Sequence, residues 1–223
     1  TYRDSLLVLL EDSNTSNDEL ESMIETANNS ILALQSDLVV QQDLVVQWQQ
    51  TAEDNRADLS NAYLRHANLS NANLRHANLS YADLRSAILN HADLTGAILN
   101  VANLRHADLT GADLTGADLT DADLTGANLD YVRGMNLLGC PAYLPTDWQC
   151  LQNNLVGPYA SLYYADLSNA DLSGADLRYA ILSHAILSHA NLTGAYLHHA
   201  SLYYADLTGA DLTNADLTGA NLL

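Results

Sequence analysis

Two apolar residues recur with a strict period of five through most of this chain of 223 residues. Ala stands at every fifth position from 57 to 127 and again from 160 to 220, and Leu stands two positions after each Ala. An α-helix turns every ~3.6 residues and a flat strand alternates its two faces, so a period of five fits neither element. On a helix these Leu residues would spread around the whole circumference. The chain must therefore turn a corner every five residues and bring each Leu onto a common inner axis.

The stretch ADLTGADLTGADLTDADLTGANL at 107–129 carries the repeat in its clearest form. It resembles the pentapeptide-repeat family, and especially the Leu-centred members that are abundant in cyanobacteria. The resemblance covers 28 units, or 140 of the 223 residues. It implies an all-β solenoid, a right-handed quadrilateral parallel β-helix in which one pentapeptide forms each side. With four units to a coil, the 28 units predict about seven coils, with an N-terminal cap and one loop insertion.

The two invariant apolar positions predict the core. A buried Leu contributes about 1.5–3 kcal/mol, and Ala fits where the chain approaches too closely for a larger side chain. Representative core residues from the first unit to the last are Leu59, Leu109, Leu129, Leu162, Leu222, Ala57, Ala107 and Ala160.

The repeat region, residues 57–223, is interrupted at about 130–159. Leu129 and Leu162 are 33 residues apart, which is not a multiple of five. We expect two degenerate units, around Gly134 and Gly157, with the residues between them looped out.

This interruption contains both cysteines of the chain, Cys140 and Cys150. Two neighbouring Cys in a chain with no others predict a disulfide, and a disulfide favours an oxidising compartment. The alternative is a pair of free thiols in the cytoplasm. Trp148 lies in the same segment, where it either takes part in recognition or folds back onto the solenoid as an anchor.

Residues 1–56 do not carry the repeat. Ser16 and Glu19 have the spacing of a capping box, and apolar residues then recur at helical spacing from Ile31 to Trp48. We expect a largely helical segment that caps the first coil, which would otherwise expose unpaired backbone groups. A dimerisation helix is the alternative, so cap-mediated and end-to-end homo-oligomers both remain open.

The composition is strongly acidic, with 27 carboxylates, eight Arg, no Lys and a net charge of −19. Such a surface repels nucleic acid phosphates and anionic membranes, so we expect no direct binding of nucleic acid. No apolar run is long enough to span a bilayer, and no membrane insertion is expected. High net charge also keeps a repetitive rod in solution, so it does not by itself imply a basic partner.

With four units to a coil, residues 20 apart within one block lie above one another. Asp occupies 13 of the 28 positions before Leu, yet Asp93 above Asp113 is the one vertical pair of Asp residues. This dispersal favours a structural role for the carboxylates, because a calcium site needs several oxygen ligands together.

Two groups of outward side chains are candidate interaction surfaces. The first is a column of cations, beside carboxylates, whose members are Arg65, Arg85 and Arg105, with His66 and His106 at its edge. A surface salt-bridge network and a recognition stripe for an acidic partner both fit this column. The second is an aromatic strip made of Tyr163, Tyr164, His184, Tyr203 and Tyr204. Stacking that stabilises the solenoid and a protein-binding patch both fit the strip.

No pattern in the chain indicates an enzyme. All eight His fall at the two outward positions after Leu, without the spacing of a catalytic or metal site, so no cofactor is expected. The family resemblance implies a non-enzymatic structural or protein-interaction solenoid, exported to the thylakoid lumen or periplasm, with another protein as partner. The alternative is an acidic DNA mimic that binds a type II topoisomerase (gyrase). The charge fits such a mimic, but relatives of that kind often place Phe on the inner axis, and this chain has no Phe.

Overall fold

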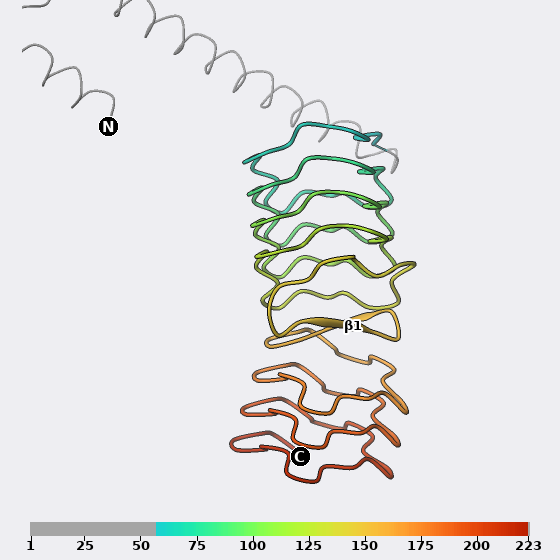
Figure 1. Cartoon of the computed structure of the whole chain (residues 1–223), viewed down its shortest axis with the longest axis vertical. Helices are drawn as coiled ribbons and strands as arrows, with labels where there is room; N and C mark the ends of the chain where they lie inside the picture. The colour runs from blue at the N-terminus through green and yellow to red at the C-terminus, as the bar shows by residue number, and fades with distance from the viewer. Residues whose placement is uncertain (1–56, 223) are drawn as a thin grey trace, which may run out of the picture. The chain divides into compact units, whose positions relative to one another are not determined.

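The computed structural model describes residues 57–222, so the predicted cap at 1–56 lies outside the described residues. Residues 57–222 form four-sided coils that stack along one axis (Figure 1). Parallel bridges join residues 20 apart within each block, from Asp58 and Asn78 at one end to Ser201 and Asn221 at the other. The corner at every fifth residue predicted from the period is confirmed, and so is the four-sided parallel β-helix implied by the family resemblance. Within this part of the chain, no helix has the length and apolar character needed to cross a membrane.

Each unit of five is held by one ladder contact and one tight turn. The N–H of Leu59 donates to the carbonyl oxygen of Asn78 at 2.7 Å, and the N–H of Asn78 donates to that of Ala57 at 2.9 Å. The turn closes when the N–H of Ala62 donates to the carbonyl oxygen of Leu59 at 3.1 Å. The last residue of each turn is left-handed, as at Asn61 with a φ of 59°. This requirement favours Gly, Asn and His, which adopt a positive φ more readily than other residues, although Tyr also stands there.

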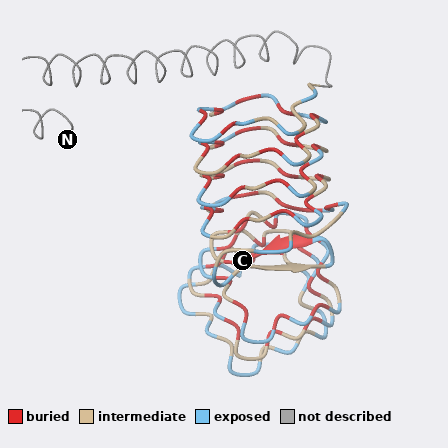
Figure 2. Ribbon diagram, turned by 45° about the horizontal axis from the view of Figure 1, so that its top comes forward, coloured by how far each residue is buried: buried red, intermediate tan, exposed pale blue. Residues whose placement is uncertain are grey.

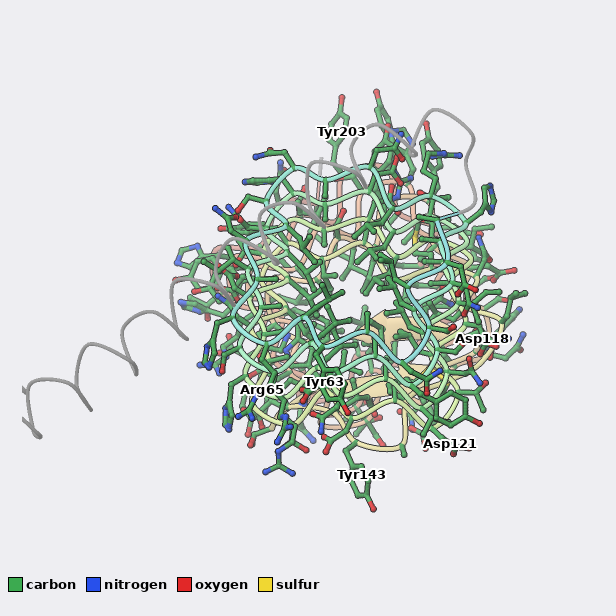
Figure 3. All side chains as sticks on the ribbon, turned by 90° about the horizontal axis from the view of Figure 1, so that it is seen from above. Tyr63, Arg65, Asp118, Asp121, Tyr143 and Tyr203 are labelled. Carbon is green, nitrogen blue, oxygen red and sulfur yellow. A yellow bond between two sulfur atoms is a disulfide. The ribbon has the colours of Figure 1, made fainter. Side chains whose placement is uncertain are left out.

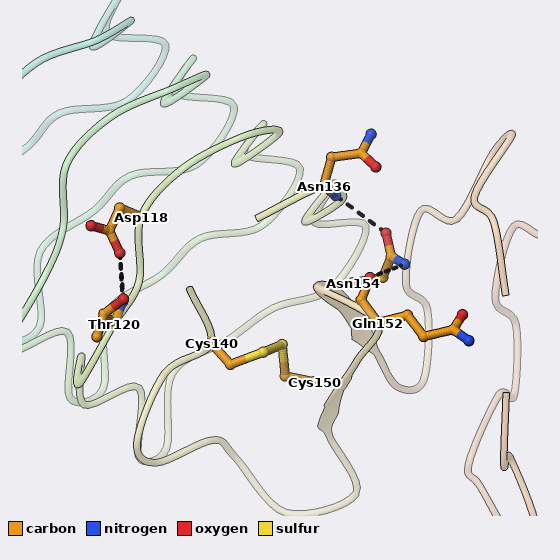
Figure 4. The surroundings of a disulfide bond; sticks show 7 residues. All are labelled: Asp118, Thr120, Asn136, Cys140, Cys150, Gln152 and Asn154. Carbon is orange, nitrogen blue, oxygen red and sulfur yellow. Dashed lines mark hydrogen bonds between the residues drawn. A yellow bond between two sulfur atoms is a disulfide. The ribbon is translucent and has the colours of Figure 1, made fainter. Parts of the chain in front are cut away.

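Asp and Asn are frequent before Leu because their side chains cap the turn. In 19 units the side-chain oxygen accepts the backbone N–H of the residue two positions further on. Figure 4 includes one example, in which Asp118 Oδ1 lies 3.0 Å from the Thr120 backbone nitrogen and 2.6 Å from its hydroxyl. The acidity of the repeat region therefore arises largely from side chains that hold the turns, since 13 of the 27 carboxylates in the chain are capping Asp.

The inner Leu and Ala positions form the core, and Figure 2 shows buried residues recurring on every side of the coils. The predicted core residues Leu109, Leu129, Leu162, Ala107 and Ala160 are buried. Leu222 was also predicted to be buried, but it is 51% exposed, and Ala57 and Leu59 are half-buried. These three residues lie in the first and last described coils, which have a described neighbouring coil on one side only.

The interruption contains four irregular units, including the two predicted around Gly134 and Gly157. Parallel bridges join Asp113 to Arg133, Asp118 to Gly139 and Asp123 to Tyr143. The N–H of Ser161 then donates to the carbonyl oxygen of Val132 at 2.9 Å, a bond that spans 29 residues where the equivalent bond from Asp83 to Ala62 spans 21. Residues below one another are therefore 28 positions apart here instead of 20. The irregular units complete one further coil between the two regular blocks.

A short hairpin occupies the interior of this coil. Strand β1 (Gln149–Leu151) pairs antiparallel with strand β2 (Asn154–Val156). The hairpin crosses the inside of the solenoid instead of projecting from it (Figures 1 and 2), and all three residues of β2 are buried. The expectation that this segment is looped out was therefore wrong.

Two glycines provide the space for the hairpin. Gly134 and Gly157 stand where a regular unit has its inner Leu. A Cβ atom on Gly134 would lie 2.6 Å from Cδ1 of Leu155, and one on Gly157 would lie 2.4 Å from Cδ2 of Trp148. Leu155 and Trp148 thus fill the volume that two inner Leu side chains would otherwise occupy.

The tip of the hairpin joins the irregular coil to the second repeat block. Asn154 is 3% exposed, and its Nδ2 donates to the carbonyl oxygens of Gln152 at 3.0 Å and Asp166 at 3.3 Å. Its Oδ1 accepts the backbone N–H of Asn136 at 3.3 Å (Figure 4). Gln152 Nε2 donates to the carbonyl oxygen of Ser168 at 2.8 Å. One buried amide therefore bonds both to the irregular coil, at Asn136, and to the second block, at Asp166.

The predicted disulfide between Cys140 and Cys150 is present and ties β1 to the wall of the solenoid (Figure 4). The two Cα atoms are 6.0 Å apart. Cys140 follows Gly139, which packs on Thr120 of the neighbouring coil. A Cβ atom on Gly139 would lie 1.9 Å from the threonine Oγ1, so a larger residue would not fit beside this cysteine.

Candidate interaction surfaces

The predicted column of cations is engaged with carboxylates along its length. Arg85 is paired with Asp83, which also faces Nε of Arg65 at 3.9 Å, and Arg105 Nη1 lies 3.3 Å from Asp123 Oδ2. The hydrogen bond from the Arg85 side chain holds the pKa of Asp83 below its ordinary value. All three Arg side chains are 40–52% exposed. This geometry is that of a surface salt-bridge network, and recognition by the column stays a prediction.

The His residues at the corners have a packing role that the sequence analysis missed. The ring of His106 lies against the backbone of Gly126, where a Cβ atom would be 2.6 Å from Nδ1 of the ring. The same arrangement joins His76 to Gly96, His91 to Gly111, His189 to Gly209 and His199 to Gly219. The signal was in the sequence, since each His stands 20 residues before its Gly.

The predicted aromatic strip is a stacked column. The ring of His184 lies between those of Tyr164 and Tyr204, with centroid distances of 4.8 and 5.2 Å. Tyr163 meets the ring edge of Tyr164 at 4.2 Å, and Tyr203 lies 4.1 Å from Tyr204. Hydrogen bonds with Tyr164 and Tyr204 raise the pKa of Tyr163 and Tyr203, respectively.

A second aromatic column runs along the preceding corner and crosses the interruption. Tyr131 meets Tyr159 edge-on at 5.7 Å, Tyr159 stacks on Tyr179 at 4.9 Å, and Tyr179 stacks on His199 at 5.1 Å. Sequence reasoning missed it because Tyr131 and Tyr159 are 28 residues apart. The lower part, Tyr159 to His199, follows the regular spacing of 20 and could have been found.

We refer to the two columns together as the aromatic surface, made of Tyr131, Tyr159, Tyr179, His199, Tyr163, Tyr164, His184, Tyr203 and Tyr204. Its rings are well exposed, with Tyr204 at 67%, Tyr164 at 59% and Tyr131 at 50%. Figure 3 places Tyr203 on the side of the solenoid opposite to Tyr63 and Tyr143. Exposed aromatic side chains grouped on an otherwise polar surface are typical of protein-binding sites.

Trp148 folds back into the solenoid. It packs on Gly157 and against the core of the second block, so it anchors the start of β1. It is nevertheless only half-buried, and it lines a cavity between the hairpin and the wall below.

The carboxylates are dispersed as the sequence predicted. Asp93 and Asp113 form the one Asp–Asp pair among the bridges of residues 57–222. A cation offsets this pair, since Nη1 of Arg75 lies 3.1 Å from Asp93 Oδ2. Across the described coils, no three His, Cys, Asp or Glu side chains are grouped in a way that would hold a metal ion.

A β-helix whose sides are single pentapeptides, with Leu on the inner axis and turns capped by Asp or Asn, defines a narrow class of solenoid. The family model described as pentapeptide repeats matches residues 57–96, 97–133, 159–194 and 190–222. The chain belongs to the pentapeptide-repeat family, and its solenoid is the right-handed quadrilateral β-helix of that family.

Several solved structures are similar to this chain. HetL, a pentapeptide repeat protein involved in heterocyst differentiation regulation in the cyanobacterium Nostoc sp. strain PCC 7120, is 35% identical. The match covers 75% of this chain and 76% of HetL with a TM-score of 0.38. The pentapeptide repeat protein alr5209 from Nostoc PCC 7120 is also 35% identical over 47% of this chain and 88% of its own, with a TM-score of 0.42. A pentapeptide repeat protein from the Arabidopsis thaliana thylakoid lumen is 27% identical over 67% of this chain and 71% of its own, with a TM-score of 0.22. Among curated proteins, no sequence matches the chain significantly.

Proposed function

We propose that this chain is a non-enzymatic protein-interaction solenoid whose aromatic surface binds another protein. The observation that carries the proposal is the exposure of Tyr131, Tyr164 and Tyr204 in two neighbouring columns of stacked aromatic rings, on a solenoid that is acidic overall. Stacking within each column fixes the rings in place, so a partner that packs on them loses little side-chain freedom on binding.

We further propose that the protein acts in an oxidising compartment, the thylakoid lumen or the periplasm. The disulfide between Cys140 and Cys150 supports this proposal, because such bonds persist outside the reducing cytosol. Thiol counting on protein taken from its native compartment, in denaturant without reductant, tests it. Two free thiols would place the protein in the cytoplasm instead.

A capture experiment with matched variants tests the interaction function. The purified protein is used as bait in extract from the native host, beside a Tyr164→Ser/Tyr204→Ser variant and a Tyr63→Ser/Tyr143→Ser control. The control removes two Tyr that are equally open, at 81% and 63% exposed, on the opposite side. We expect the first variant to lose a partner that the control retains. Equal capture by all three proteins would contradict binding through the aromatic surface.

The alternative function, an acidic DNA mimic that binds gyrase, has the net charge of −19 in its favour. Much of that charge sits on carboxylates that cap turns, which gives it a structural explanation. A supercoiling assay with purified gyrase is the direct test of the alternative.

A further inference from the structure

A cavity of about 490 Å³ lies between the beginning of the hairpin and the wall of the second block. Asp147 and Trp148 line it from the hairpin side, and Asp176, Arg178 and Tyr196 line it from the wall. Its volume falls within the range of pockets that hold small ligands or single side chains of a partner. Arg178 directly precedes Tyr179, so the cavity adjoins the aromatic surface.

The aromatic wall of the cavity is held in place before any ligand binds. The indole of Trp148 packs on the backbone of Gly157, and the Trp148 backbone N–H donates to the carbonyl oxygen of Pro145 at 3.2 Å. The disulfide from Cys140 to Cys150 fixes the strand that follows. A preorganised site of this kind avoids part of the ordering cost of binding.

The charges in the cavity do not balance. Arg178 is paired with Asp176, to which its Nε donates at 2.9 and 3.0 Å, and this hydrogen bonding raises the pKa of the guanidinium. The charge of Asp147 also helps to raise the pKa of Arg178, but Asp147 forms no ion pair within 4.0 Å among the described residues. Two carboxylates therefore face one cation that is already engaged, in a chain of net charge −19. An anionic ligand would have to compete with Asp176 for Arg178, whereas a cation meets an unpaired carboxylate.

We propose that this cavity binds the side chain of an Arg or Lys presented by a basic segment of the protein partner. The cationic group pairs with Asp147 and lies against the aromatic side chains of Trp148 and Tyr196, since cations are attracted to aromatic rings in partly desolvated sites. The negative field of the whole chain draws such a segment toward the cavity. The inference rests on the proposed interaction function and specifies the chemistry of the partner.

Fluorescence of Trp148 tests the inference directly. The sequence has two Trp, so a Trp48→Phe variant of the full chain leaves Trp148 as the sole reporter. This protein is titrated with the capped tripeptides Gly-Arg-Gly and Gly-Glu-Gly. We expect a saturable change in Trp148 emission with the Arg peptide, at a dissociation constant of about 1 mM for a single anchoring side chain, and none with the Glu peptide. An equal response to both peptides, or no saturable response to the Arg peptide, would overturn the inference.

Two further substitutions test whether the Arg peptide binds at this cavity or is attracted only by the net negative charge of the protein. Asp147→Asn removes the unpaired carboxylate and is expected to weaken binding of the Arg peptide about fivefold, as the loss of one partly exposed ion pair would. Asp121→Asn removes an equal charge from an exposed residue of another coil and should leave the affinity unchanged. Equal weakening by both substitutions would show that net charge causes the binding, and it would contradict the proposed site in the cavity.

The capture experiment then distinguishes the two proposals. If the partner is retained by Asp147→Asn but lost by Tyr164→Ser/Tyr204→Ser, the interaction function stands and the cavity inference fails. If no partner depends on the aromatic surface but the Arg peptide binds in an Asp147-dependent way, the cavity is a cation site and the proposed function of the aromatic surface fails.

Discussion

At the scale of single residues, the positions after each Leu do more than form turns. Gly126 and Gly116 have nearly the same left-handed conformation, with φ of 68° and 69°. They differ in what lies beside them, because Gly126 packs against the ring of His106 while nothing lies within 4 Å of a Cβ on Gly116. Substituting Ala at Gly116 and at Gly126 therefore separates the cost of the left-handed backbone conformation from the cost of packing against a neighbouring ring.

We predict that Gly126→Ala destabilises the protein more than Gly116→Ala. Both substitutions place Cβ in a left-handed residue, at a cost of about 1–2 kcal/mol. Gly126→Ala must also displace the His106 ring, which adds about 1 kcal/mol in the free energy of unfolding. Urea denaturation measures both losses. Adding His106→Ala to Gly126→Ala should return the loss to that of Gly116→Ala, and equal losses in the two single variants would refute the packing role of His106.

Single residues also show which contacts could be predicted from the sequence. The burial of Leu109 and Ala107 follows from the period alone, because only two of the five positions can point inward. The stacking of Tyr164, His184 and Tyr204 follows from the spacing of 20. The contact of Tyr131 with Tyr159 does not, since its offset of 28 depends on where the hairpin enters and leaves the wall.

At the scale of elements, the hairpin is the feature that sequence patterns could not reveal. Strands β1 and β2 have three residues each, which is too short for an alternating pattern to appear. The prolines and cysteines around them are typical of an external loop. What sends the hairpin inward is the absence of side chains at Gly134 and Gly157, a packing effect between segments that are distant in sequence.

We predict that the disulfide contributes most of the stability of this element. Cys140→Ser/Cys150→Ser should lower the free energy of unfolding by ~2.8 kcal/mol, the chain entropy of a ring closed by a sequence separation of 10. Urea denaturation of the double variant measures the loss, and a reducing agent added to the wild type should reproduce it. A reducing agent should have no effect on the double variant. Unchanged stability would mean that the packing of Trp148 and Leu155 suffices to hold the hairpin.

At the scale of the whole molecule, turn capping couples stability to pH. Hydrogen bonds to the side chain and backbone of the residue two positions on lower the pKa of several Asp, including Asp58, Asp171, Asp206 and Asp216. A carboxyl whose pKa is lower in the folded state stabilises the fold above its ordinary value of 3.8. That contribution is lost as the pH falls through the lowered value.

We predict that the free energy of unfolding changes little from neutral pH to about 5 and falls steeply below about 4. Relief of charge repulsion in a chain of net charge −19 acts in the opposite direction. The dispersal of Asp along the columns limits that repulsion, so we expect loss of the turn hydrogen bonds to dominate. Urea denaturation across this pH range measures the balance, and stability that rises on acidification would show that repulsion dominates.

The hairpin, together with Gly134 and Gly157, also shows how a solenoid of this kind can gain or lose an insertion. Residues below one another are 28 apart across the hairpin and 20 apart within the regular blocks, so eight residues can be removed at the hairpin without altering which side each regular unit occupies. A chain shortened in this way would need Leu at 134 and 157 to refill its centre. The hairpin therefore behaves as an exchangeable module, which a regular rod can acquire together with two Leu→Gly substitutions. A cavity such as the one beside Trp148 can in this way be added to the family fold while the repeats on either side keep their register.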